Sequence, residues 1–323
     1  MPAADATSVS ATVLIPTWRR AESLGRCLDA LAAQERRPDE VLLVVRDDDE
    51  ETRGALAARP SSGLAIRLTP PPAPGVIAAL NAGFDAARGD VIAVIDDDTA
   101  PDRDWLARIV ARFAAAPDLG GLGGRDRVVG PDGGSEEPAD VVVGRVLWFG
   151  RVVGNHHLGA GEIRDVDILK GANMALRRAA LGELRIDPAL RGRGAQPHWE
   201  IDLSLGLKAA GWRLAYDPAI QLDHFPETRH EGAREETMSP QQRFDAVHNQ
   251  TYALLKYLPP GRRLVALAYA LAVGTNADPG LALALAPLLK GHSPRPALSR
   301  MRVASAARIA ALRSWRRWRR SRH

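Results

Sequence analysis

The 323-residue chain is poor in cysteine and in long apolar runs, two features that mark disulfide-linked, zinc-binding and membrane-spanning proteins. Cys27 is its single cysteine, which excludes an internal disulfide and any zinc site built from several cysteines. Long apolar runs are also missing. The longest one, residues 264–273, is too short for a bilayer, which needs roughly 20 residues. We therefore expect no conventional transmembrane helix.

Two further absences concern the start of the chain and nucleotide binding. Residues 1–10 have neither a basic start nor a long apolar core, so we expect no secretory signal there. No Gly-x-x-x-x-Gly-Lys-Ser/Thr sequence occurs, which argues against a P-loop enzyme. The run Gly120-Gly-Leu-Gly-Gly124 lacks the strand-turn-helix order of a dinucleotide fingerprint, and we interpret it as a flexible connection.

Length and charge suggest a folded enzyme with a basic end. The 46% hydrophobic content allows a sizeable core, in one large α/β domain with an appendage or in two modest domains. The net charge is +4, yet residues 290–323 contain one Lys, ten Arg and no acid, so the rest of the chain is net acidic. A single cysteine is typical of an intracellular protein.

Three adjacent acids, Asp96, Asp97 and Asp98, follow the apolar run 91–95. Alternation along a strand sends Asp96 and Asp98 to one side and Asp97 to the other, so the outer two can share a divalent ion. Hard carboxylate oxygens suit Mg²⁺ or Mn²⁺, which substrate phosphates commonly share. A structural alternative is an acidic turn that caps the helix predicted to begin near Asp102.

Apolar runs alternate with helical patterns along the first hundred residues. We predict strands at 11–16, 41–45, 65–68 and 91–95, with helices at 22–34, up to 58, and at 76–87. This alternation favours a mainly parallel sheet with right-handed crossovers. The run 41–45 also ends in acids, including Asp47 and Asp48, so both groups would meet at the carboxyl edge of the sheet.

Other polar motifs lie further along the chain. Gly171 would let a ligand approach the backbone, and the Asn173 amide could bind a sugar hydroxyl, although a turn residue is the simpler interpretation. In residues 198–203, Trp199 could stack on a sugar while Glu200 or Asp202 removes a proton. These acids could equally stabilise the start of a helix.

Five sequence blocks in this order carry a family resemblance: residues 13–20, 44–48, 81–98, 170–173 and 199–203, with Gly211 and His224 downstream. Over residues 11–225 the chain resembles the family-2 inverting glycosyltransferases of GT-A fold. The resemblance implies an α/β fold with a Rossmann-like, mainly parallel central sheet flanked by helices, followed by a helical C-terminal extension.

The resemblance also implies roles for individual residues. Pro16, Thr17 and Arg20 would lie near the base and phosphates of a nucleotide sugar, and Asp47 or Asp48 would accept from the base imide. Asp96 would hold the ribose, and Asn81 and Asp97 would belong to the same nucleotide-sugar site. Asp98 and His224 would bind the metal, Mn²⁺ or Mg²⁺. Glu200 matches the general base, with Asp202 in reserve, while Gly171, Asn173 and Trp199 would contact sugar or acceptor.

Departures from the family pattern leave the base of the donor open. Arg46 interrupts the usual acidic pair, and Leu80 stands where a basic residue is frequent. The sequence therefore favours a uridine donor over thymidine or guanosine donors but does not identify the base. The alternatives are a sugar-phosphate nucleotidyltransferase, which would carry an early glycine-rich loop that this chain lacks, and an inactive glycan-binding protein of the same fold.

The carboxyl-terminal third predicts helices. We divide the chain into a catalytic domain at 1–227, a helical extension packed on it at 228–262, and an apolar helical hairpin with a basic amphipathic tail at 263–323. Tryptophans among arginines favour docking of residues 290–323 on an anionic membrane surface over a solvated tail, and no nucleic-acid partner is expected. We thus expect a cytoplasmic enzyme, peripheral on the inner face of the cell membrane, with a glycan or lipid-linked acceptor.

Overall fold

The computed structural model describes residues 9–60, 62–130, 132–226 and 238–321. The chain forms two compact units, and each is discontinuous in sequence. Unit 1 comprises residues 1–145, 154–186 and 207–228, and unit 2 comprises residues 146–153, 187–206 and 229–323. The domain boundary predicted at 227 lies outside the described residues, so the three-domain division stays a prediction.

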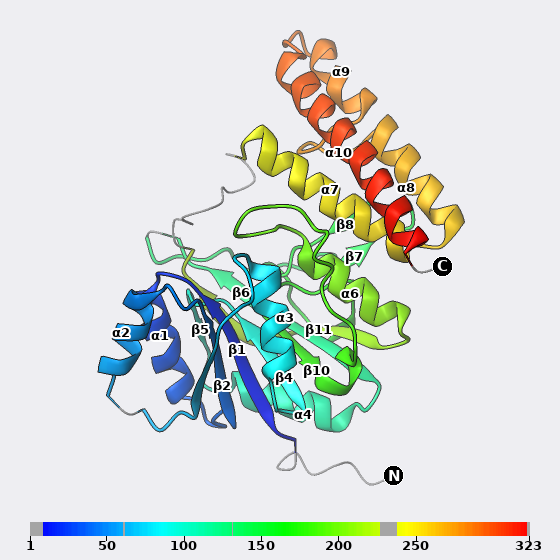
Figure 1. Ribbon diagram of the computed structural model, residues 1–323. Helices are drawn as coiled ribbons and strands as arrows, with labels where there is room; N and C mark the ends of the chain where they lie inside the picture. Colours follow the sequence, from blue (N-terminus) through cyan, green and yellow to red (C-terminus); the bar gives the residue numbers. More distant parts are fainter. Residues whose placement is uncertain (1–8, 61, 131, 227–237, 322–323) are drawn as a thin grey trace. The chain divides into compact units, whose positions relative to one another are not determined.

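A nine-stranded, mostly parallel sheet forms the centre of unit 1 (Figure 1). Its order is β3-β2-β1-β4-β10-β6-β11-β5, with β9 paired to β11. Strand β10 is antiparallel to both of its neighbours, and β5 and β9 are antiparallel to β11. The strands are β1 (Ala11–Thr17), β2 (Glu40–Val45), β3 (Ile66–Thr69), β4 (Val91–Ile95), β5 (Thr99–Pro101), β6 (Leu119–Val128), β9 (Arg164–Asp165), β10 (Asn173–Arg177) and β11 (Arg213–His224).

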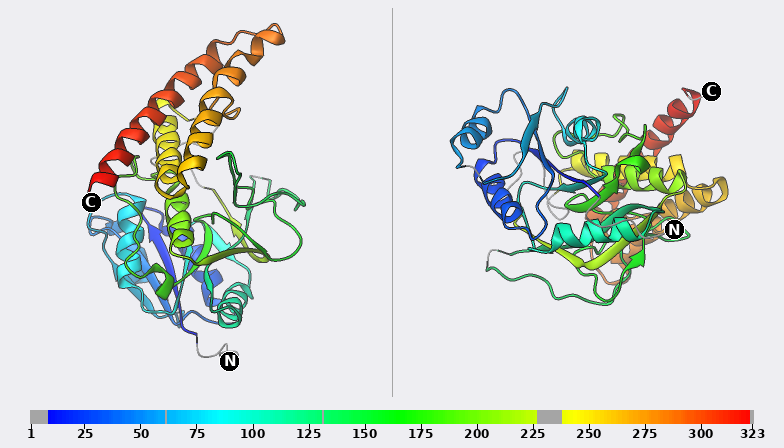
Figure 2. Two further views of the ribbon diagram at one scale, coloured as in Figure 1. Left: turned by 90° about the vertical axis from the view of Figure 1, so that its right-hand side faces the viewer. Right: turned by 90° about the horizontal axis from the view of Figure 1, so that it is seen from below.

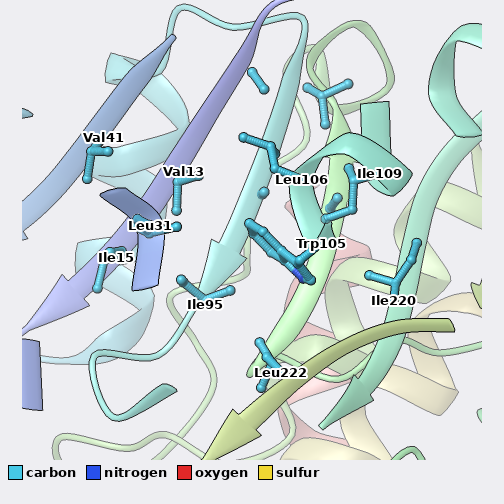
Figure 3. Packing of buried hydrophobic residues seen from close by; sticks show 14 of the residues in the cluster. Val13, Ile15, Leu31, Val41, Ile95, Trp105, Leu106, Ile109, Ile220 and Leu222 are labelled. Atoms are coloured by element: carbon cyan, nitrogen blue, oxygen red, sulfur yellow. The ribbon is translucent and has the colours of Figure 1, made fainter. Parts of the chain in front are cut away.

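Helices cover both faces of this sheet, as the alternation of apolar side chains requires. Val13 and Ile15 of β1 belong to one core cluster with α1 and α4, and Figure 3 shows Trp105 of α4 at its centre. Leu14 points to the opposite face, where a Cβ on Gly83 of α3 would collide with it, so the glycine allows helix and strand to pack closely. The helices are α1 (Ala21–Ala32), α2 (Glu50–Ala58), α3 (Val76–Ala86), α4 (Trp105–Ala115) and α5 (Arg178–Leu181).

The glycine run 120–124 corrects one of the predictions. These residues are not a flexible connection but the buried first half of β6, an interior strand of the sheet. A Cβ on Gly121 would lie 2.8 Å from the side chains of Leu169 and Leu214, and one on Gly124 would lie 2.1 Å from the Ile220 carbonyl oxygen. Large neighbours from elsewhere in the chain therefore fill the space that the glycines leave, which local composition does not reveal.

Unit 2 is mainly helical. Its helices are α7 (Pro240–Tyr257), α8 (Pro260–Ala272), α9 (Leu281–Leu289) and α10 (Arg295–Arg320), together with most of α6 (Trp199–Ala209). Strand β7 (Arg145–Val146) pairs with β8 (Val152–Val153) in a separate two-stranded sheet. Ser239 begins α7 with a capping box completed by Gln242. In the region where an apolar helical hairpin was predicted, α8 and α9 are separated by residues 273–280.

Helix α10 runs along α7 (Figure 2). Small residues make the contact, because Ala304, Ala307 and Ala311 are fully buried and share one face of α10. The Ser314 hydroxyl, on the same face, lies 3.0 Å from Nε2 of His248 in α7. Within the described residues, no helix combines the length and the apolar character needed to cross a membrane.

Candidate functional site

The three acids after β4 lie at the carboxyl edge of the sheet in unit 1. Asp96 and Asp98 converge with His224, and one potential ligand atom from each of the three residues lies within 4.8 Å of the others. The strand alternation predicted this convergence of Asp96 and Asp98. Asp98 and His224 are buried, while Asp96 is partly exposed.

Sheet pairing explains how His224, more than 120 residues away in sequence, reaches Asp98. Strand β5 begins directly after Asp98 and pairs antiparallel with the end of β11, so that Thr99 is opposite His224. The backbone N–H of Phe225 donates to the Asp98 carbonyl oxygen at 2.8 Å. Nε2 of His224 consequently lies 3.3 Å from Oδ1 of Asp98.

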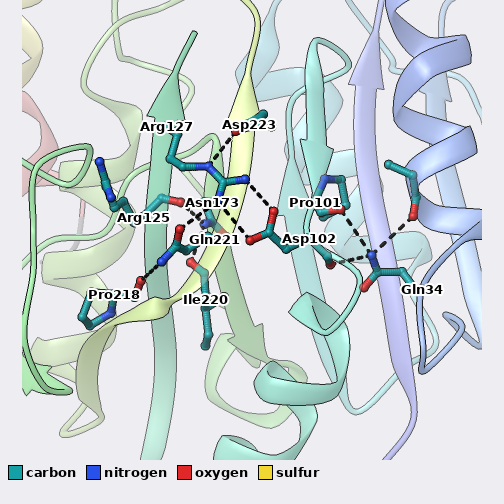
Figure 4. A network of polar contacts seen from close by, with 11 residues as sticks. Gln34, Pro101, Asp102, Arg125, Arg127, Asn173, Pro218, Ile220, Gln221 and Asp223 are labelled. Atoms are coloured by element: carbon teal, nitrogen blue, oxygen red, sulfur yellow. Dashed lines mark hydrogen bonds and ion pairs between the residues drawn. The ribbon is translucent and has the colours of Figure 1, made fainter. Parts of the chain in front are cut away.

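A second set of contacts fixes the end of β11. The Arg127 guanidinium of β6 donates to Asp102 at 2.5 Å, to Asp223 at 2.6 Å and to Gln221 at 2.8 Å (Figure 4). Because Arg127 and Asp126 are adjacent in β6, their side chains point to opposite sides of the sheet. Arg127 therefore holds the end of β11 from one side of the sheet, while Asp126 lies with His224 on the other side.

Asp97 is not part of the group formed by Asp96, Asp98 and His224, and it has partners of its own. Its carboxylate accepts from the Thr17 hydroxyl at 2.7 Å and from the Arg20 guanidinium at 2.9 Å. Burial raises the pKa of Asp97 to about 7, although Arg20 and Thr17 oppose the shift. Arg20 also lies 3.3 Å from Asp98, so it bridges both acids. Asp97 thus connects the acidic edge to the end of β1, where Thr17 lies, and to Arg20 just after the strand.

Two further residues of this cluster, Asp126 and Lys170, were not predicted as site residues. The Asp126 side chain is fully buried in β6, pairs with the Lys170 ammonium and lies 3.8 Å from Nδ1 of His224. Burial alone would lower the pKa of His224, but Asp126 and Asp98 outweigh it and raise that pKa to about 9. Had 119–128 been recognised as a strand, an acid near its carboxyl end would have been a candidate.

The side chains present fit a divalent cation. Two carboxylates and one imidazole are ligand types that Mn²⁺ accepts, and ligand atoms at ~2.1 Å from one ion lie no more than about 4 Å apart. Small side-chain rotations would bring Asp96, Asp98 and His224 to that separation. The neighbouring Asp126 carboxylate matches the acidic partner that metal-binding histidines commonly have.

The remaining predicted nucleotide contacts near β1 and β2 lie at the surface of unit 1. Pro16 is partly exposed near the end of β1. Asp47 and Asp48 are exposed and pair with Arg53 and Arg46, respectively. The third acid of this run, Asp49, was not predicted. It is buried, begins α2 by accepting from Thr52, and accepts from the Arg19 backbone N–H at 2.7 Å.

The side-chain amides of two predicted site residues, Asn173 and Asn81, form hydrogen bonds within the protein. Asn173 is fully buried, accepts from the Trp105 indole and donates to the carbonyl oxygens of Arg125 and Ile220, the latter two shown in Figure 4. These bonds occupy the amide inside the sheet, which argues against the predicted contact between Asn173 and a sugar. Asn81 exchanges hydrogen bonds with both backbone groups of Ile186. Gly171 is partly exposed in a turn before β10.

The second group of predicted residues begins α6 in unit 2. Glu200 is partly exposed, whereas Trp199 and Asp202 are buried. Asp202 accepts from the Lys256 ammonium at 2.7 Å and from the Asp187 backbone N–H at 3.2 Å. A buried carboxylate held by an ammonium is poorly placed to accept a proton from a substrate, so Glu200 is the better candidate for the base. Trp199 exposes too little surface for broad stacking.

Helix α7 holds the segment that leads to Glu200. Asn249 accepts from the Arg191 N–H at 2.7 Å and donates to the carbonyl oxygens of Arg191 and Pro197, both at 2.8 Å. Gln196 and His198, just before α6, have positive φ angles of 39° and 65°, a conformation that costs energy in residues other than glycine. The bonds from α7 offset that strain and fix the start of α6.

Comparisons with known proteins find glycosyltransferases among the proteins that resemble this chain. An uncharacterised glycosyltransferase of Mycobacterium tuberculosis is 29% identical over 212 residues, which cover 66% of this chain and 83% of that protein. A glucosyl-dolichyl phosphate glucuronosyltransferase of Haloferax volcanii is 24% identical over 221 residues, covering 67% of this chain and 68% of the relative.

Two solved structures share the fold. A mannosyltransferase of Pyrobaculum calidifontis, in complex with GDP-Man and Mn²⁺, has a TM-score of 0.55 at 18% identity and covers 97% of this chain and 89% of its own. GalNAc-T7 with UDP, GalNAc and Mn²⁺ has a TM-score of 0.57 at 16% identity and covers 76% of this chain and 48% of its own. They confirm the GT-A type of fold that the sequence predicted.

The model of the family described as "Glycosyltransferase like family 2" matches residues 10–249, which include the acidic edge, His224 and the Glu200 segment. The chain therefore belongs to the family-2 glycosyltransferases.

Proposed function

We propose that this glycosyltransferase is metal-dependent and inverting, and that it moves a sugar from a nucleoside-diphosphate sugar to an acceptor hydroxyl. The convergence of Asp96, Asp98 and His224 at the sheet edge carries the proposal. The family match favours glycosyl transfer over the alternative of a sugar-phosphate nucleotidyltransferase. The two solved structures of similar fold contain Mn²⁺ and so support manganese as the metal. One contains UDP and the other GDP-Man, and we favour a UDP-sugar as the donor.

The roles of the unit 1 residues follow from their chemistry. Asp98 and His224 would hold the metal, and Asp96 the ribose with its carboxylate next to them. A bound divalent cation would neutralise the charge that develops on the departing diphosphate. Arg20 pairs with Asp97 and Asp98, and the positive charge of its guanidinium would attract a diphosphate bound at this edge. Asp126 would keep the His224 ring in place.

Glu200 is the proposed general base. Its carboxylate would remove the proton from the acceptor hydroxyl while that oxygen attacks the anomeric carbon from the face opposite the leaving diphosphate. This in-line displacement inverts the anomeric centre. The proposed setting is the synthesis of cell-envelope or surface glycans at the inner face of the cell membrane, with a glycan or lipid-linked acceptor.

Replacing the proposed base tests the mechanism. Glu200→Gln keeps the size and polarity of the side chain but removes the proton acceptor, so we expect transfer to fall by roughly 10²- to 10⁴-fold with unchanged donor binding. Sugar transfer and calorimetric donor affinity measure the two effects. Glu183→Gln, an exposed acid of unit 1, is the matched control. Full transfer by Glu200→Gln would move the base role to another residue.

A further inference from the structure

Leucine side chains line the outer sides of α8 and α9 in unit 2. Leu264 and Leu271 are 72% and 52% exposed and lie seven residues apart, so they share one side of α8. On α9, Leu281, Leu285 and Leu288 recur at helical spacing and are 56%, 40% and 55% exposed. Single exposed leucines are ordinary, but two ordered stripes on consecutive helices indicate a surface that is covered in use.

The region around these stripes is strongly basic. Residues 260–321 contain eleven arginines and one lysine against a single acid, Asp278. Asp278 already pairs with Arg243 of α7. The carboxyl end of α10 exposes Arg313, Arg316, Arg317, Arg319 and Arg320. Leucines and cationic groups thus occur together on the three helices.

A tryptophan extends the apolar surface beside α8. Trp148 is 70% exposed, and its carbonyl oxygen accepts from Arg262 of α8. The neighbouring Phe149 packs edge-on against Tyr269 of the same helix, with ring centroids 4.6 Å apart. Tryptophan is the side chain most typical of the zone between lipid headgroups and hydrocarbon.

We infer that the leucine stripes of α8 and α9 dock on an anionic lipid bilayer, with α10 supplying the attraction for its headgroups. The inference deepens the proposed membrane setting, because it moves the apolar contact from residues 290–323 to residues 264–289. Charge favours a bilayer over a second copy of the chain. A second copy would bring another strongly basic set of helices and repel the first, whereas a bilayer offers its hydrocarbon boundary to the leucines and its anionic headgroups to the arginines. Leucines enter the headgroup boundary and arginines remain at the phosphates.

Vesicle sedimentation of the full chain tests the inference without donor or acceptor, so a failed transferase assay cannot imitate its failure. We expect binding to vesicles of phosphatidylcholine with phosphatidylglycerol and little binding to phosphatidylcholine alone. Leu285→Asp/Leu288→Asp should lower the affinity at least about tenfold at both about 0.1 M and about 0.5 M NaCl. Arg316→Gln/Arg319→Gln should weaken binding mainly at the lower salt, where the charges are less screened.

The control adds the same two carboxylates elsewhere. Val142 and Ile163 are exposed residues of unit 1, and Val142→Asp/Ile163→Asp should bind vesicles within about twofold of the parent chain. Equal vesicle binding by the leucine variant would overturn the inference. So would a dimer in light scattering that the leucine variant dissociates, without any phosphatidylglycerol-dependent binding, because a second copy would then cover the stripes.

Discussion

The pKa values of two buried histidines in unit 1 are shifted in opposite directions because their neighbours differ. His224 lies among carboxylates, which raise its pKa to about 9 against the effect of burial. His156 is buried beside a backbone carbonyl, with Nε2 3.1 Å from the Ile168 oxygen, and burial lowers its pKa to about 4. Without a metal, the carboxylates therefore keep His224 protonated, and a bound cation would have to displace that proton, whereas His156 packs as a neutral ring.

The His156 pKa predicts a dependence of stability on pH. The unfolded chain binds a proton near pH 6.5 and the folded protein only near pH 4, so the contribution to stability is complete above pH 6.5 and is lost as the pH falls toward 4. We expect the free energy of unfolding to fall by about 2 kcal/mol from this group between pH 7 and pH 5. Urea unfolding at both values measures it.

The matched variant is His156→Gln, which keeps a hydrogen-bond donor for Ile168 and removes the titration. Its stability difference between pH 7 and pH 5 should shrink by the same amount. An unchanged difference would show that other groups cause the acid sensitivity.

The sequence assigned Asp96, Asp98 and His224 to one site, and the structure brings the three side chains close together. It assigned no role to Asp126. The acids after β4 stand out because they follow a recognisable apolar strand. Asp126 follows a run of glycines whose strand character comes from Leu169, Leu214 and other distant side chains. Burial of Asn173 and Asp202 likewise depends on partners remote in sequence, which argues against the functional roles predicted for them.

Among the helices and strands, α7 positions the segment that leads to Glu200, a role that its amphipathic sequence pattern does not indicate. Its Asn249 bonds Arg191 and Pro197, and Lys256 pairs with Asp187 and Asp202. Burial opposes the charge of Lys256, yet the carboxylates outweigh that effect and raise its pKa. Helix α7 thereby holds the residues on either side of the strained turn before α6.

Removing the Asn249 amide should loosen that turn. Asn249→Ala leaves several buried backbone groups without partners, and we expect a loss of about 3 kcal/mol in the free energy of unfolding. Transfer should fall with it, while nucleotide affinity is retained, because the segment carries Glu200 and no nucleotide contact. Asn276→Ala, at an exposed position, is the control. Equal stabilities of the two variants in urea would contradict the role.

Helix α10 shows how tertiary packing selects among faces of an amphipathic helix. The larger apolar residues of this helix recur near helical spacing in the sequence: Leu298, Met301, Ile309, Leu312, Trp315 and Trp318. In the structure the alanines at 304, 307 and 311 face α7, and Ile309 is half exposed. Small side chains let two helices approach closely, so a stripe that looks weakly hydrophobic makes the tighter contact.

For the molecule as a whole, a correct donor should stabilise the fold by mass action. With Mn²⁺ present, the preferred nucleoside diphosphate at about 100 times its Kd should add about 2.7 kcal/mol and raise Tm by several degrees. A thermal-shift panel of UDP, GDP and dTDP measures it. Asp98→Asn should abolish the Mn²⁺-dependent part, whereas Asp104→Asn, at a surface ion pair, should not. A shift with none of the diphosphates would count against the proposed donor class.

By itself the sequence determined the class of fold, the order of the first strands and helices, and the acidic edge after β4. These depend on local apolar periodicity and on residues adjacent in the chain, which any stretch of sequence displays. The tertiary structure alone decided that a glycine run becomes an interior strand, that Asp126 joins His224, and that α7 fixes the turn before Glu200. Those features arise from side chains far apart in sequence that meet only when the strands pair and the helices pack.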